Sequence, residues 1–156
     1  MNLAELISKD SVVCNADVGS KKRALELLAE LLAKQSATAD ALEIFQHLTE
    51  REKLGSTSLG HGVAIPHALT SGSDKAIGAF IKLEHGIDFD SPDSKPTDLL
   101  FALMVPEHYT DEHLEILSNL ASRFSDEALC HNLRSSNTSK ELYDRLTGWH
   151  VASQAS

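Results

Sequence analysis

Apolar residues recur along this chain with two different spacings, and each spacing predicts a different kind of secondary structure. From Ser20 onward they return every three or four residues, which is the spacing of an amphipathic helix. A second helix is predicted from a cap at Thr38 or Asp40 to Lys53, where Gly55 ends it. The first third of the chain is therefore expected to contain a pair of helices.

Strands are predicted where the apolar pattern is short or strictly alternating. Residues 11–17, SVVCNAD, give a first strand, and residues 76–83, AIGAFIKL, alternate as a half-buried strand does. A brief apolar run at 63–65 ends at Pro66. Residues 99–105, LLFALMV, are apolar throughout, which is typical of a central strand buried on both faces.

The remainder of the chain is predicted to be one loop and three helices. Residues 85–96, HGIDFDSPDSKP, are typical of a loop or edge hairpin. Helices are expected to begin at Thr110, which places His113 on the apolar stripe, at a cap on Ser125, and at Thr138, which opens a capping box. Because strands alternate with helices, the pattern favours a single α/β domain in which helices cover a sheet.

Composition and charge narrow the class of protein. A chain of 156 residues fits one domain, and its net charge of -9 argues against nucleic acid as the main partner. No apolar run is long enough to span a bilayer, and the opening MNLAELISKD lacks a secretory pattern, so a cytoplasmic protein without membrane insertion is expected. The basic run 21–23 at a helix start opposes the helix dipole, and indicates either a solvated face or a small docking patch.

The most informative stretch is 51–69, REKLGSTSLGHGVAIPHAL, in which one histidine follows a proline after a glycine-bearing loop. Gly55 and Gly60 have the spacing of a P-loop, but His61 and Gly62 stand where lysine and serine or threonine are needed. The histidines lack the spacing of a metal site, the two cysteines form no CxxC pair, and no GxSxG elbow is present. Nucleotide, metal and acyl-transfer chemistry are therefore not favoured, and no cofactor or metal is expected.

What remains is a histidine nucleophile at His67. A neutral imidazole has a free lone pair near pH 7 and can carry a covalent group, for which a phosphoryl group is the natural candidate. Arg51 could stabilise its charge, and His113 could hold His67 or the incoming group. The alternatives stay open: Arg51 could form a surface ion pair with Glu50 or Glu52, and His113 could be a core histidine.

The glycine-bearing loop supplies further candidates for the same site. Ser56, Thr57 and the loop amides could donate hydrogen bonds to phosphoryl oxygens. Gly60 and Gly62 are better explained by tight turns and by the close approach of a partner's backbone than by a nucleotide.

The motif RExLGST followed by GxGxAIPH resembles the phosphorylation site of the fructose/mannitol-type enzyme IIA domains of the bacterial phosphoenolpyruvate-dependent phosphotransferase system. Further segments are similar to the nitrogen-regulatory branch of that family: SKKRALELLAELLAK, IDFDSPDSKPTDLLFALMVPE and HLEILSNLASRF. Histidine at position 61 and Ala68 depart from the common pattern, which leaves details of docking open. The likeness covers nearly the whole chain.

The resemblance implies a mixed β-sheet flanked by helices on both faces, with residues 1–150 as the enzyme IIA-type domain and 151–156 as a flexible tail. It implies that His67 accepts a phosphoryl group through Nε2 from a phosphorylated HPr-type carrier, and that Arg51 and His113 support the transfer. The expected role is regulation of partner proteins, such as sensor kinases or potassium transporters, according to phosphorylation state. The alternative is a sugar-transport enzyme IIA that passes phosphate to an enzyme IIB domain.

Overall fold

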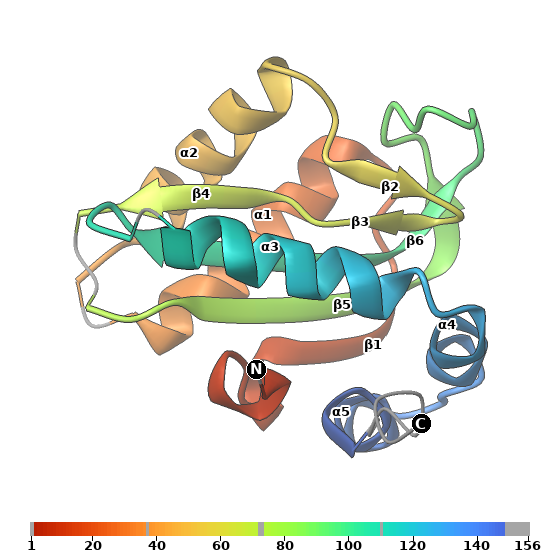
Figure 1. The fold of residues 1–156 in the computed structure, drawn as a ribbon. Helices are drawn as coiled ribbons and strands as arrows, with labels where there is room; N and C mark the ends of the chain where they lie inside the picture. Colours follow the sequence, from red (N-terminus) through yellow and green to blue (C-terminus); the bar gives the residue numbers. More distant parts are fainter. Residues whose placement is uncertain (1, 37, 72–73, 110, 149–156) are drawn as a thin grey trace.

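The computed structural model describes residues 2–36, 38–71, 74–109 and 111–148. In these residues, one sheet lies between two layers of helices (Figure 1). The elements are, in chain order, the short 3-10 turns η1 (Leu3–Glu5) and η2 (Lys9–Ser11), strand β1 (Val12–Ala16), helices α1 (Lys21–Gln35) and α2 (Ala41–Lys53), strands β2 (Ser58–Gly60), β3 (Val63–Ala64), β4 (His67–Thr70), β5 (Ile77–Ile87) and β6 (Thr97–Pro106), and helices α3 (Asp111–Phe124), α4 (Glu127–Arg134) and α5 (Ser139–Gly148).

The sheet is mixed and is built around β6. Its order is β1-β5-β6-β3-β2, and β4 also pairs with β6. Strands β5 and β6 run antiparallel, whereas β1 pairs parallel with β5, and β3 and β4 pair parallel with β6. The apolar run 99–105 lies within β6 and is buried throughout, which confirms the prediction of a central strand.

Each face of the sheet has its own apolar core. Helices α1 and α2 cover one face, where Leu28, Leu32 and Leu48 are fully buried among strand residues such as Ile81. The other face packs against α3, α4 and α5, and there the ring of Phe80 stacks on Phe124 with centroids 5.7 Å apart. Fully burying one such side chain contributes about 1.5–3 kcal/mol. The predicted α/β fold with helices on both faces is confirmed (Figure 1).

The helices begin where hydrogen-bonding side chains permit. Ser20 accepts from the amide of Arg23 at the start of α1, and Asp40 rather than Thr38 caps α2. The predicted cap at Ser125 is wrong, because Asp126 accepts from two amides at the start of α4.

Two predicted helix starts remain, at Thr110 and at Thr138. The predicted start at Thr110 lies outside the described residues, as does the predicted tail 151–156. The hydroxyl of Thr138 accepts from the amide of Glu141, as a capping box requires. The Glu141 carboxylate, however, accepts from the amide of Asn137 and not from that of Thr138.

The strand boundaries also differ from the predictions. Strand β5 continues to Ile87, so the predicted loop begins only after it, and β5 and β6 form a long central hairpin rather than an edge hairpin. Strands β2 and β4 were not predicted, because each has at most four residues and lies beside glycine or proline. In the described part of the chain, no helix is long and apolar enough to cross a membrane.

Candidate functional site

His67 is the first residue of β4, directly after an interruption in the strand. Strand β3 ends at Ala64, and Pro66 separates it from β4, which pairs from His67 opposite Leu103 of β6. Nδ1 of His67 lies 2.9 Å from the carbonyl oxygen of Ile65. Since a carbonyl can only accept, Nδ1 carries the hydrogen in the neutral ring. The lone pair is therefore on Nε2.

The surroundings of His67 favour this neutral form. Burial lowers its pKa from the ordinary value, and the nearby positive charge of Arg51 acts in the same direction, as does His113. The hydrogen bond to Ile65 and the negative charge of Glu52 oppose these effects without cancelling them. The ring is thus kept uncharged and nucleophilic near neutral pH.

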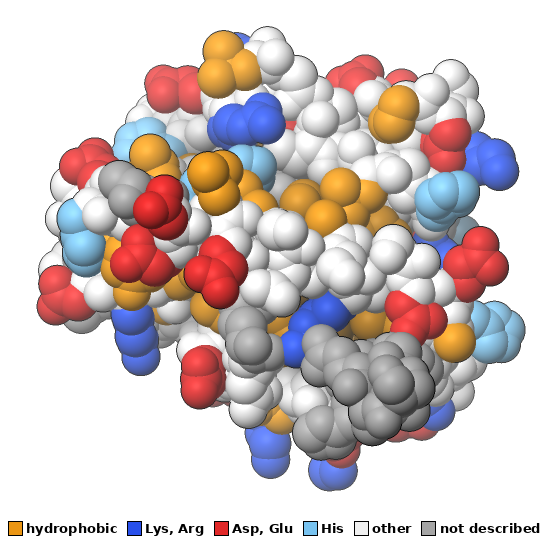
Figure 2. All heavy atoms as spheres, viewed as in Figure 1, with side chains coloured by type: hydrophobic (Ala, Val, Ile, Leu, Met, Phe, Trp, Pro, Cys, Tyr) orange, Lys and Arg blue, Asp and Glu red, His pale blue; other side chains and the backbone are white. Residues whose placement is uncertain are grey.

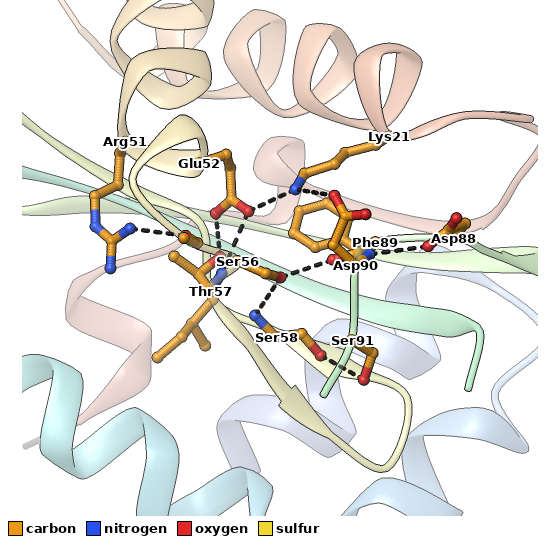
Figure 3. Close-up of polar contacts among 12 residues, drawn as sticks. Lys21, Arg51, Glu52, Ser56, Thr57, Ser58, Asp88, Phe89, Asp90 and Ser91 are labelled. Atoms are coloured by element: carbon orange, nitrogen blue, oxygen red, sulfur yellow. Dashed lines mark hydrogen bonds and ion pairs between the residues drawn. The ribbon is translucent and has the colours of Figure 1, made fainter. Parts of the chain in front are cut away.

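Arg51 lies in the last turn of α2, beside His67. Its Nη1 donates a 2.9 Å hydrogen bond to the carbonyl of Gly55, which follows the helix end (Figure 3). Among the described residues Arg51 has no ion pair, so the alternative of a salt bridge to Glu50 or Glu52 is not realised. The remaining guanidinium N–H groups are available for an anion.

His113 reaches the same place from α3, on the other side of the sheet edge from Arg51. The centroids of the His67 and His113 rings are 5.6 Å apart, and the rings are tilted by 57°. Nδ1 of His113 is buried without a hydrogen-bond partner in the part of the chain that the structure describes, and burial lowers the pKa of the ring. A buried polar atom without a partner is costly, so the position of His113 beside His67 is not explained by a hydrogen bond of Nδ1.

These side chains lie around one shallow hollow of about 590 Å³. Arg51, His67 and His113 all line it, together with the exposed Leu54 and the partly exposed Leu69. In Figure 2, apolar, basic and histidine side chains meet on this face over α2, β4 and the start of α3, with acidic side chains to one side. A cluster of exposed large apolar side chains around a polar centre is typical of a surface that another protein covers.

The other loop candidates lie away from the hollow. The hydroxyl of Ser56 donates to the carbonyl of Phe89, and that of Thr57 donates to Glu52 (Figure 3). Both hydroxyls therefore shape the loop rather than face His67.

Gly60 and Gly62 form the turn between β2 and β3, both with φ of +81°. A Cβ at Gly62 would clash with the guanidinium of Arg134 and come within 2.8 Å of Asp98, and neither glycine lines the hollow. Their conformation explains the glycines as turn residues, with a close approach to another part of the same chain.

One feature near the site was missed from the sequence. Glu52, the residue after Arg51, is buried and pairs with Lys21 at the start of α1. The basic run 21–23 was the available signal, since a lysine at a helix start is better placed when a carboxylate faces it.

Fold and site together define a family of phosphotransfer proteins. Residues 5–148 match the family described as "Phosphoenolpyruvate-dependent sugar phosphotransferase system, EIIA 2", and the chain belongs to this family.

Three relatives place the chain more narrowly within the family. The nitrogen regulatory protein of Klebsiella oxytoca is 40% identical over 148 residues, which are 94% of this chain and 91% of that protein. That of Pseudomonas aeruginosa is 43% identical over 143 residues, covering 92% and 93%. The crystal structure of nitrogen regulatory protein IIA-Ntr from Neisseria meningitidis superposes with a TM-score of 0.87 at 43% identity, covering 93% of this chain and 99% of that one. The chain is thus similar over almost its whole length to nitrogen-regulatory members.

Proposed function

We propose that the protein is a histidine phosphocarrier in which Nε2 of His67 accepts a phosphoryl group. The hydrogen bond from Nδ1 to the carbonyl of Ile65 is the observation that carries this proposal, because it leaves the lone pair on Nε2. Ser56 and Thr57 form hydrogen bonds that shape the loop, whereas Arg51 and His113 line the same hollow as His67.

The transfer is a direct displacement at phosphorus. The Nε2 lone pair forms the new N–P bond as the P–N bond to the donor's phosphohistidine breaks, and the bonding electrons stay on the donor's ring nitrogen. The donor ring, protonated on its other nitrogen, leaves as neutral imidazole, and His67 keeps its proton on Nδ1. No water and no redox partner takes part. Arg51 supplies positive charge and N–H donors to the equatorial oxygens, and the ring of His113, 5.6 Å from that of His67, is the second group that can hydrogen-bond the phosphoryl group.

The donor is, in this proposal, a phosphorylated HPr-type carrier protein. The exposed fractions of Leu54 (84%), Leu69 (46%) and Leu114 (66%) give apolar area for such a protein to cover on the side of His67 and His113. The cytoplasm, expected from the sequence, is the place of the reaction in this proposal.

Phosphorylation would then act as a switch for the binding of regulated target proteins. A phosphoryl group adds about -1.5 to -2 charge at pH 7, enough to favour or repel a docking surface. The name shared by the relatives, nitrogen regulatory protein, supports this role over the sugar-transport alternative. Equal affinity of a target for phosphorylated protein, unmodified protein and His67→Ala would count against it.

The test of the phosphoryl acceptor uses intact mass. The protein is mixed with phosphoenolpyruvate, enzyme I and an HPr-type carrier, and a gain of one phosphoryl group is expected. His67→Ala should lose the gain, whereas the exposed His131→Ala, on α4, should keep it. Phosphorylation of His67→Ala to the level of the unsubstituted protein would refute the assignment.

A further inference from the structure

An ion pair with a buried carboxylate links the start of α1 to the end of α2, beside the loop that follows Arg51. Nζ of Lys21 lies 3.0 Å from Oε1 of Glu52, and only 4% of the Glu52 side chain is exposed (Figure 3). The amide of Thr57 donates to Oε1 at 3.3 Å, and the hydroxyl of Thr57 donates to Oε2. Both oxygens of this carboxylate are therefore engaged.

Lys21 is held in place from several directions. Its ammonium also contacts Asp90 at 3.1 Å and lies 4.5 Å above the ring of Phe89. Burial lowers its pKa, but the hydrogen bonds and charges of Glu52 and Asp90 outweigh burial, so the pKa is raised overall. Lys21 thus stays protonated at any physiological pH, and its charge is a fixed part of this region.

The same pair adjoins the proposed site of transfer. Glu52 follows Arg51 in the last turn of α2, and its partner Thr57 lies two residues after Gly55, which Arg51 holds. The negative charge of Glu52 raises the pKa of the His67 imidazole, but by less than burial, Arg51 or His113 shifts it. An unbalanced carboxylate here would oppose the arrival of a dianionic phosphoryl group.

We propose that Lys21 is a positioning residue for phosphoryl transfer: it neutralises Glu52, which follows Arg51 in the chain, and through Glu52 it holds the 55–57 loop against the end of α2. This inference rests on the proposed function, since it assigns Lys21 a role in the same transfer. It also gives the first lysine of the basic run a function, whereas Lys22 has no ion pair with any residue that the structure describes.

The test removes each charge separately and then both together. The variants are Lys21→Met, Glu52→Gln and the double variant, with Lys21→Arg as the charge-retaining form and Lys22→Met as the matched control. The amide introduced by Glu52→Gln keeps an oxygen that can accept from Thr57, so the double variant restores neutrality without leaving a bare carboxylate. Two quantities are measured: the pKa of His67 by NMR, and the rate and extent of phosphorylation by a limiting HPr-type donor.

We expect the pKa of His67 to rise in Lys21→Met and to fall in Glu52→Gln. We expect Lys21→Met to lower the rate and the equilibrium extent of phosphorylation by about three- to tenfold, the size of one screened charge interaction in a partly buried site. The double variant should return both quantities most of the way to those of the unsubstituted protein. Lys21→Arg and Lys22→Met should leave them within about twofold, since the charge at Glu52 is still balanced.

The proposal is overturned if the double variant is no better than Lys21→Met, because removing the unpaired carboxylate should then have restored the rate and the pKa of His67. It is also overturned if the pKa of His67 does not move in either single variant. If Lys21→Met fails to fold, the test compares Glu52→Gln with the double variant. The double variant lacks the positive charge of Lys21, so its His67 pKa should be higher than that of Glu52→Gln. An unchanged His67 pKa would refute the proposal. These pKa readings need no phosphoryl donor, so they remain valid even if His67 proves not to be the acceptor.

Discussion

Replacing Thr57 by valine tests how much the buried carboxylate of Glu52 depends on its hydroxyl partner. The change keeps the shape of the side chain and removes a single hydrogen bond, the one that Thr57 donates to Oε2. Hydrogen bonds to charged groups contribute about 1.5–3 kcal/mol, and a buried acceptor left without a partner loses that amount. The Thr57 amide and Lys21 still contact Oε1, so we expect a loss of about 2 kcal/mol, toward the lower end of that range.

The matched control is Thr97→Val. The hydroxyl of Thr97 is also buried, but it has no hydrogen-bond partner in residues 2–148 apart from the undescribed positions 37, 72–73 and 110, and valine suits its place in β6. Its removal should leave the free energy of unfolding unchanged or raise it by up to about 1 kcal/mol. Urea denaturation at about pH 7.5 would measure both variants, and a loss of about 2 kcal/mol should lower the melting temperature by roughly 4–8 °C. Equal stability of the two variants would refute the reasoning, because it would mean that the bond to Glu52 contributes nothing.

Three further predictions concern the site and the central strand. Arg51→Ala and His113→Ala should each slow phosphorylation at least about tenfold, because each removes a group that the proposed transfer places beside the phosphoryl oxygens. Neither residue is part of a core, so the melting temperature should be nearly unchanged. Phosphoryl incorporation and thermal unfolding measure the two effects, and a normal rate in both variants would contradict the proposed roles. Burial lowers the pKa of His67 and His113 below 6.5, so the unfolded chain binds more protons than the folded one just below that pH. The free energy of unfolding should therefore fall as the pH drops from 6.5 through the folded-state pKa values, and then level off. A double variant with glutamine at both positions should show a smaller fall when denaturation is measured across that range. Leu103→Ala, at a fully buried position opposite His67, should cost about 3–4 kcal/mol in urea denaturation; a loss below about 1 kcal/mol would show that the core relaxes around the cavity.

The sequence predicted the long elements well because their patterns are repeated many times. The apolar run 99–105 alone was enough to predict a strand buried on both faces, and the leucine spacing after Ser20 predicted α1. Strand β4 has only four residues after a proline, which is too short for any period to emerge, although its first residue is the candidate nucleophile.

The residues of the candidate site were selected from the sequence, but their hydrogen bonds and ion pairs were not predicted. His67, Arg51 and His113 were selected by motif and chemistry, and the structure brings all three into one hollow. The pair between Lys21 and Glu52 joins two helices, and local patterns cannot reveal which charges face each other across such an interface. For the same reason Ser56 and Thr57 were taken as candidate donors to phosphate, when their partners are Phe89 and Glu52.

The carbonyl of Ile65 has a second effect once His67 is modified. With phosphorus on Nε2, the ring can keep or lose the proton on Nδ1, and a carbonyl oxygen 2.9 Å away favours keeping it, since two lone pairs would otherwise face each other. A phosphorylated ring that keeps the Nδ1 proton departs as neutral imidazole, which is a far better leaving group than the imidazolate anion that an unprotonated ring would become. The contact that prepares the nucleophile therefore also prepares the leaving group, and we expect a reactive modification that is quickly returned or passed on, so that its level follows the state of the donor pool rather than storing a past signal.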